Sequence, residues 1–220
     1  MDVDPQSLSP IEQYKILSGA VVPRPIAFVS SCSRDGAVNL APFSFFNGMG
    51  ANPMIVVFSP VTSGRQDKDT LRNVRLPEDG GTGEFVVNLA VEGYFRQMAA
   101  CAEPLDYGQS ELDMVGLTAA ESRVVRPPRV AESPVSFECR TLQIVSTNPG
   151  EHMSANIVIG RVEHVWLHDD VVDDAWHIDQ EALGAVGRVG GPEYVRTRTR
   201  YAFVRGREAL ERPLPWEDEG

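Results

Sequence analysis

Two neighbouring segments decide the fold: Val22-Pro23-Arg24-Pro25-Ile26-Ala27-Phe28-Val29-Ser30 and Asn39-Leu40-Ala41-Pro42-Phe43-Ser44-Phe45-Phe46. Pro23 and Pro25 bracket Arg24, so the backbone there is extended and cannot join a helix. The segment Arg34-Asp35-Gly36, which lies between the two, is typical of a tight turn. The pattern predicts a β-hairpin with a proline at its entry and another at its exit.

The second strand of this hairpin ends in residue types that line ligand pockets. Small residues are followed by the hydroxyl group of Ser44 and the aromatic rings of Phe45 and Phe46. This mixture suits a flat ligand that carries a polar tail. The hairpin is therefore a candidate wall of a binding site.

The composition indicates one soluble globular domain. A chain of 220 residues can bury one substantial hydrophobic core. Its net charge of −11 should repel nucleic acid. No apolar run approaches the roughly 18 residues of a membrane span, and the acidic N-terminus shows no signal-peptide pattern. We expect a single domain over residues 1–220, with neither nucleic acid nor membrane as a partner.

The cysteines indicate a reducing compartment. Cys32, Cys101 and Cys139 are odd in number, lie far apart and form no CxxC pair. Free thiols are the ordinary state of such residues in the cytosol. The predicted location is therefore cytoplasmic.

Further apolar segments predict mainly strands. Expected strands cover residues 54–59, 84–90, 135–146, 157–160, 162–166 and 194–204, and expected helices cover residues 10–17, 69–74 and 94–102. Strands outnumber helices and no internal repeat is visible. The prediction is a β-rich barrel or sandwich with a few helices outside it.

A polar segment, Ser63-Gly64-Arg65-Gln66-Asp67-Lys68-Asp69-Thr70, contains the components of a phosphate site. Glycine allows close approach of backbone amides, Arg65 and Lys68 supply positive charge, and Thr70 supplies a hydroxyl. The GxxxxGK[ST] spacing of a P-loop is absent. On residue types alone, a solvated loop is the favoured interpretation and a phosphate site the alternative.

Two other polar groups have ordinary explanations. His164 and His168 fall on an expected strand, where four positions separate the rings by roughly 13 Å, too far for one metal ion; no metal is predicted. Arg196, Arg198 and Arg200 alternate with threonines and share one face if they form a strand. They form either a solvated or subunit-facing edge or a rim that attracts an anionic cofactor.

Motifs of two common enzyme classes are missing. Ser30, Ser31 and Ser44 are candidate nucleophiles, but no GxSxG elbow is present. The glycine-rich segment 184–191 lacks the GxGxxG spacing of a dinucleotide-binding turn. Neither acyl transfer nor a Rossmann site is predicted.

The order of the short segments resembles the flavin reductase-like family of FMN-binding split-barrel proteins. The resemblance covers residues 11–204 and rests on these pieces: Pro23-Arg24-Pro25-Ile26-Ala27, Asp35-Gly36, Asn39-Leu40-Ala41-Pro42-Phe43-Ser44-Phe45-Phe46, Pro53, Phe58-Ser59, Lys68-Asp69-Thr70-Leu71-Arg72-Asn73, Glu84-Phe85-Val86-Val87-Asn88-Leu89, Gly150-Glu151-His152, Ile159-Gly160-Arg161-Val162 and Arg188-Val189-Gly190-Gly191 with Tyr194. It implies a six-stranded antiparallel split β-barrel with Greek-key topology and peripheral helices. It also implies a homodimer with FMN near the subunit interface.

The same resemblance implies roles for individual residues. Those expected to contact or support FMN are Arg24, Ala41, Pro42, Phe43, Ser44, Phe45, Ser59, Lys68, Thr70, Asn88, Arg188 and Tyr194. Among them, Lys68 and Thr70 would hold the phosphate, and Asn88 would anchor the site. Arg188 and Tyr194 would close the pocket. His152 would face the reactive side of the flavin and is the candidate catalytic residue.

The implied activity is NAD(P)H-dependent flavin reduction, with NADH or NADPH as donor and free flavin, oxygen or a monooxygenase partner as acceptor. Hydride transfer to a flavin needs no strong protein acid or base, which agrees with the lack of a catalytic dyad. Two alternatives remain: a flavoprotein that reduces another acceptor or transfers electrons, and a flavin-binding protein that is not an enzyme.

Two regions depart from the family pattern. Residues 77–83 lengthen the link between Asn73 and Glu84, and they either shape the site of a larger substrate or form an inert surface insertion. Residues 205–220 have no counterpart and are expected to form a solvated acidic tail.

Overall fold

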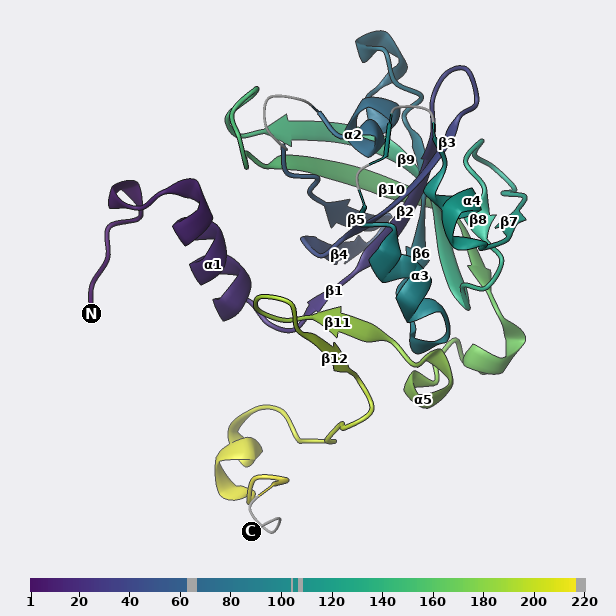
Figure 1. Cartoon of the computed structure of the whole chain (residues 1–220). Coiled ribbons are helices and arrows are strands. Elements are labelled where there is room, and N and C mark those ends of the chain that lie inside the picture. Colours follow the sequence, from purple (N-terminus) through teal and green to yellow (C-terminus); the bar gives the residue numbers. More distant parts are fainter. Residues whose placement is uncertain (63–66, 104, 107–108, 217–220) are drawn as a thin grey trace.

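The computed structural model describes residues 1–62, 67–103, 105–106 and 109–216 and consists mainly of antiparallel strands (Figure 1). Its large sheet has seven strands in the order β3-β2-β6-β9-β10-β5-β4. They are β2 (Ala27–Cys32), β3 (Val38–Phe43), β4 (Phe46–Ala51), β5 (Met54–Phe58), β6 (Glu84–Leu89), β9 (Val135–Ser146) and β10 (Asn156–Leu167). The predicted fold class is confirmed, although the sheet has seven strands where six were expected.

The connection between β3 and β4 shows that this sheet is curled. The two strands are its opposite edges, yet only Ser44 and Phe45 separate them. From Phe43 to Phe46 the chain can span at most about 11 Å. The edges of a seven-stranded sheet come this close only if it wraps into a barrel, which leaves a split where β3 and β4 meet without pairing. Ser44 and Phe45 lie at this split.

The predicted hairpin is confirmed as β2 and β3. Ala27 pairs with Phe43 and Cys32 with Val38, around a turn in which Gly36 has a φ of 92°. All six residues of β2 are buried. A strand in the middle of the barrel wall is covered on both faces, which explains its apolar and small residues.

A two-sided core surrounds β2. Ala27 and Val29 belong to a cluster with Phe43, Phe58 and Phe85. Phe28 points to the opposite face, where its ring stacks on Tyr94 at 5.8 Å in a second cluster. The alternation of side chains along one strand therefore joins two packed layers.

Strand β10 is continuous where two separate strands were expected. The predicted break falls at Arg161, which lies inside the strand and pairs with Arg140 of β9, next to Gly160, which pairs with Thr141. A Cβ atom at Gly160 would overlap the ring of Phe85. Glycine is thus required by close packing of the strand on β6, and it does not end the strand.

Two small sheets complete the β structure: β1 (Arg24–Pro25) with β11 (Val186–Arg188) and β12 (Tyr194–Arg196), and β7 (Ala119–Ala120) with β8 (Arg129–Val130). The expected strand over residues 194–204 was wrong beyond Arg196. Its arginines enter an ion-pair network: Arg196 Nη2 lies 2.9 Å from Glu92 Oε2, and Arg198 also contacts Glu92 and Glu181. These ion pairs neutralise the positive charge of the arginines. They therefore argue against the interpretation that the arginines form a rim that attracts an anionic cofactor.

The helices lie outside the barrel. They are α1 (Pro10–Ala20), α2 (Asp69–Val74), α3 (Phe95–Ala100), α4 (Glu111–Val115) and α5 (Gln180–Leu183), with 3₁₀ turns at Pro5–Ser7, Pro77–Asp79, Glu92–Tyr94, Asp169–Val171 and Arg207–Glu211. Helix α1 starts with a capping box of Ser9 and Glu12. Figure 1 shows α1 and the C-terminal segment standing apart from the sheet. Within the described residues, no helix is long and apolar enough to cross a membrane.

The two regions outside the family pattern are now placed. The loop at residues 77–83 packs against the β2–β3 turn, because Arg34 Nε donates to the Gly81 carbonyl over 3.1 Å and its Nη2 to that of Pro77. In the C-terminal segment, residues 205–216 carry three arginines against two glutamates, so this described part is not acidic. Its exposed residues include Leu210 and Trp216.

Candidate functional site

Two hollows border the segment at the barrel split. The first, which we name the polar pocket, has a volume of about 520 Å³. Ala41 and Pro42 of β3 contribute to it together with Lys68, Thr70 and Arg72 around α2. The second hollow involves Phe45, only three residues beyond Pro42. One short stretch of chain therefore contributes to two sites of different character.

Lys68 is the residue of the polar pocket best suited to bind an anion. Its Nζ lies 5.6 Å from the centre of the Phe43 ring. Although the residue is exposed at the surface, the loss of water around the ammonium lowers the pKa of Lys68. A partly desolvated cation interacts more strongly with an anionic ligand than a fully hydrated one.

Thr70 is buried beside it. Its hydroxyl oxygen accepts a hydrogen bond from Asn39 Nδ2 over 2.8 Å, which leaves its proton for a second partner. Residues 63–66, the first half of the predicted phosphate segment, lie outside the described residues. Of that prediction, the structure brings together Lys68 and Thr70.

The sequence did not indicate the carboxylates of the polar pocket. Glu111 of α4 reaches the pocket and accepts a hydrogen bond from the backbone N–H of Leu40 over 2.9 Å. Burial raises the pKa of Glu111. Burial also raises the pKa of Asp69, although the positive charge of Arg72 acts in the opposite direction. Forty-two residues separate the two in sequence, so no local motif could have revealed their proximity.

The second hollow, which we name the apolar cavity, has a volume of about 300 Å³. Helix α1 and the barrel supply its walls, which are formed by Pro10, Gln13, Tyr14, Leu17, Phe45, Ser59, Val61, Met153, Ala155 and Ile157. None of these described lining residues carries a charge. The cavity therefore suits a flat, uncharged ring.

One buried group in the apolar cavity has unused hydrogen-bonding capacity. The Ser59 hydroxyl is inaccessible to solvent and has no hydrogen-bond partner among the described residues. Its backbone N–H donates to the carbonyl of Phe45 over 2.9 Å, which fixes Ser59 beside the barrel split. Buried polar groups without partners are rare and indicate a ligand or an ordered water.

The chain matches the family described as Flavin reductase like domain over residues 18–184. It belongs to this family. It is 40% identical over 199 residues to the uncharacterized protein BH2278 of Halalkalibacterium halodurans, covering 88% of this chain and 91% of that protein. Two solved structures are similar: nitrilotriacetate monooxygenase component B from Bacillus cereus (30% identity, TM-score 0.85, 92% of this chain and 98% of that chain), and 2-nitrobenzoate 2-nitroreductase NbaA of Pseudomonas fluorescens (28% identity, TM-score 0.81, 94% and 97%).

The uncharged cavity fits the flat ring system of a flavin. The phosphate of a flavin mononucleotide would need the cations of the polar pocket, Lys68 and Arg72, which share that pocket with the carboxylates of Asp67, Asp69, Glu103, Asp106 and Glu111. The unpartnered Ser59 hydroxyl could bond to a ring edge. Ser44 is half-buried and lies in sequence between Pro42, which lines the polar pocket, and Phe45, which lines the apolar cavity.

Arg24 has a structural role that the sequence did not reveal. It is only 4% exposed. Its Nη1 donates to the carbonyls of Ser18 and, over 2.7 Å, Val21, and its Nη2 donates to that of Val189 over 3.1 Å. The guanidinium lies 5.7 Å from the centre of the ring of Phe45, a residue of the apolar cavity, and its hydrogen bonds tie α1 to Val189, just after β11.

The side-chain amide of Asn88 is bound by groups of the protein itself. It is fully buried, and its Nδ2 donates to the Phe28 carbonyl over 3.0 Å. Its Oδ1 accepts from the N–H of Val130 and from the Ser136 hydroxyl, each over 2.9 Å. Protein groups thus occupy this amide, which joins β2, β8 and β9, and a contact between Asn88 and the cofactor stays a prediction.

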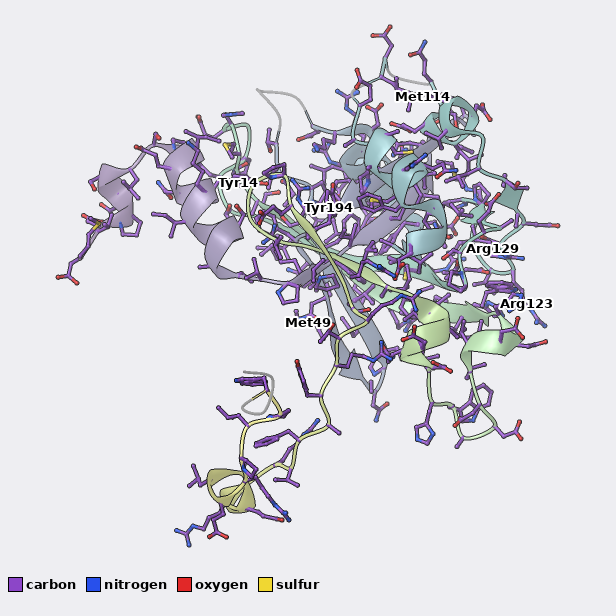
Figure 2. The ribbon with its side chains drawn as sticks, turned by 60° about the horizontal axis from the view of Figure 1, so that its bottom comes forward. Tyr14, Met49, Met114, Arg123, Arg129 and Tyr194 are labelled. Carbon is purple, nitrogen blue, oxygen red and sulfur yellow. The ribbon has the colours of Figure 1, made fainter. Side chains whose placement is uncertain are left out.

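Arg188 and Tyr194 lie together but outside both hollows. The Arg188 guanidinium stacks 4.4 Å from the centre of the Tyr194 ring, which packs edge-on against Phe95. Tyr194 is labelled in Figure 2 and belongs to the small sheet beside α1. Neither residue lines the polar pocket or the apolar cavity in the described chain, so their closing role stays a prediction.

His152 occupies the exposed loop between β9 and β10. The next residue, Met153, has a φ of 62° and lines the apolar cavity. His152 is therefore one residue from the cavity wall, and its catalytic role stays a prediction. Of the other histidines, His164 lies 3.4 Å from Glu138 and His168 lies 3.4 Å from Asp170. The described residues contain no group of three side chains placed to hold a metal ion.

Proposed function

We propose that the protein binds FMN at the barrel split and catalyses NAD(P)H-dependent reduction of flavin. The observation that carries this proposal is the pair of hollows beside residues 41–45: an uncharged cavity with an unsatisfied buried hydroxyl, and a pocket with a partly desolvated lysine. Membership of the flavin reductase like family supports it.

The bound flavin would supply the redox chemistry, accepting hydride from the nicotinamide and passing electrons onward. The chain's own residues bind and orient. Lys68 and Thr70 hold the phosphate, Ala41 to Phe45 follow the flavin, and the Ser59 hydroxyl donates to a polar atom of the ring edge. His152, next to the cavity wall, orients the nicotinamide or exchanges a proton with solvent.

A spectroscopic titration tests this function. The purified protein should acquire a perturbed visible flavin spectrum when FMN is added, and anaerobic NADH or NADPH should bleach it. A protein that binds FMN without oxidising either nucleotide would be a flavin-binding protein and not a reductase. A protein that leaves the FMN spectrum and fluorescence unchanged would contradict the proposal altogether.

The acceptor we propose is a flavin that is released to a monooxygenase partner. The similar Bacillus cereus protein is described as a monooxygenase component B, which supports this role. We place the reaction in the cytoplasm, where the three buried free cysteines would remain reduced. Addition of free flavin should then give saturation kinetics.

A second candidate function is direct reduction of an organic acceptor. The similarity to 2-nitrobenzoate 2-nitroreductase NbaA favours it, because that protein acts on a small aromatic substrate. The two functions differ in their kinetics. A flavin reductase turns over with added flavin alone, whereas a dedicated reductase reduces its bound cofactor once and then requires its own acceptor.

We further propose a homodimer. The part of α1 turned away from the cavity exposes apolar side chains, and Ile16 is 56% exposed. The C-terminal segment does the same, with Leu210 87% exposed. Because both segments stand apart from the barrel (Figure 1), a second copy of the chain could cover them. Light scattering after size-exclusion chromatography would measure the mass.

A further inference from the structure

One face of α1 forms part of the apolar cavity. Pro10, Gln13, Tyr14 and Leu17 follow the spacing of a single helical face, and these four are among the ten residues that line the cavity. Tyr14 is half-buried, and Figure 2 shows it on α1 near the main body of the protein. Its ring meets that of Phe45 edge-on, with 6.1 Å between the ring centres. The helix therefore places an aromatic residue beside the barrel split.

The position of this helical face is fixed from the barrel side. Arg24 donates to the carbonyls of Ser18 and Val21, at the C-terminal end of α1. These carbonyls have no partner within the helix, so a buried guanidinium is a strong cap for them. The same guanidinium stands over the Phe45 ring. Tyr14, Arg24 and Phe45 thus form one connected unit around the cavity.

We infer that Tyr14 and Gln13 bind the ring system of the flavin, so that α1 contributes to cofactor affinity although it lies outside the barrel. This inference rests on the proposed function and assigns further residues to the same site. The Tyr14 ring supplies a flat apolar contact. The Gln13 Nε2 donates to the Leu8 carbonyl over 3.0 Å, so its amide offers its oxygen and its second N–H to the polar edge of the ring. The lack of charged lining residues matches the neutral oxidised ring.

Binding of FMN and of riboflavin separates the contribution of the ring from that of the phosphate. Riboflavin has the same ring as FMN but no phosphate. Tyr14→Ala should weaken the binding of FMN and riboflavin by the same factor, about tenfold for the loss of one aromatic contact of about 1.4 kcal/mol. Lys68→Ala should weaken FMN alone. Flavin fluorescence quenching measures all four dissociation constants without any turnover.

Matched variants on the same helix serve as controls. Tyr14→Phe keeps the ring and should bind both flavins as the natural protein does. Lys15→Gln alters an exposed neighbour that does not line the cavity and should also change nothing. Circular dichroism of each variant would show that α1 is retained.

The outcomes separate the two proposals. Equal losses for FMN and riboflavin in Tyr14→Ala, with normal binding in Tyr14→Phe, would support the inference. Unchanged affinities in Tyr14→Ala, while the natural protein binds FMN, would overturn the role of α1 and leave the proposed function standing. Failure of the natural protein to bind either flavin would overturn both.

Discussion

The two walls of the apolar cavity are built in different ways. The barrel wall, which includes Phe45, Val61 and Ile157, is continuous with the strands and with a packed cluster around Phe58 and Phe85. The helix wall is α1, which stands apart from the sheet in Figure 1 and exposes apolar residues. One wall is held by the core of the fold, and the other by the hydrogen bonds of Arg24 and the edge-on contact between Tyr14 and Phe45.

Because the two walls are held differently, they should contribute differently to flavin binding. Close packing allows few alternative arrangements, so the barrel wall should keep its shape whether or not a ligand is bound. A helix with few buried contacts can open locally at low cost in free energy. The barrel split would then determine where the flavin binds, while α1 would influence how long it stays.

The largest effect is expected from damage to the barrel wall. In Gly160→Ala the new methyl group overlaps the Phe85 ring, and overpacking of this kind costs about 1–3 kcal/mol of stability, here at the upper end because β10 and β6 cannot separate. Chemical denaturation would measure the loss. Gly48→Ala in β4 is the matched control, because its methyl group meets no atom within 4 Å. Equal stability of the two variants would contradict the prediction that the barrel wall is rigid.

A smaller and more local effect is expected from the helix wall. Arg24→Met removes three hydrogen bonds to carbonyls, and the loss should cost about 2 kcal/mol, typical for hydrogen bonds of a charged group. Hydrogen exchange should accelerate in α1 while β2 stays protected. Arg24→Lys should give an intermediate result, because one ammonium cannot reproduce the planar fork. A uniform loss of protection across β2 and α1 would show that the two walls are not independent.

The affinity of the polar pocket for the FMN phosphate should depend on charge alone. Lys68→Ala is expected to reduce FMN affinity about tenfold, or about 1.4 kcal/mol, because it removes a cation next to the phosphate. Lys68→Arg should retain most of the affinity, and salt should weaken binding in both proteins that keep the charge. Unchanged FMN affinity in Lys68→Ala would remove this residue from the phosphate site.

The smallest effect should come from Glu111 and depend on pH. Its pKa in the folded protein is raised from 4.5 by burial. The native state therefore favours the protonated form, and the stability that this form contributes is fully present below pH 4.5 and is lost as the pH rises through the folded pKa. Glu111→Gln, which can still accept from Leu40, should be the more stable protein at neutral pH. The advantage should vanish in thermal melts in acid; an advantage that persists at all pH values would contradict this origin.

Local chemistry in the sequence determined the hairpin and the cofactor family. Gly36 permits the turn, the prolines keep the entry and exit extended, and the order of the segments indicates an FMN-binding split barrel. These features depend on neighbouring residues or on short motifs. The grouping of Lys68 with Thr70 could also be predicted, because two positions in sequence separate them.

Only the tertiary structure decided the contacts of Arg24, Asn88 and Tyr14. Arg24 and Val189 are 165 residues apart, and Asn88 and Ser136 are 48 apart, yet each pair shares a hydrogen bond. The closure of the barrel creates these contacts by bringing the strand edges at Phe43 and Phe46 together. A polar residue looks the same in sequence whether it meets a ligand or a carbonyl. The choice depends on which groups the fold leaves without a partner, and among the described residues that line the apolar cavity that group is the Ser59 hydroxyl.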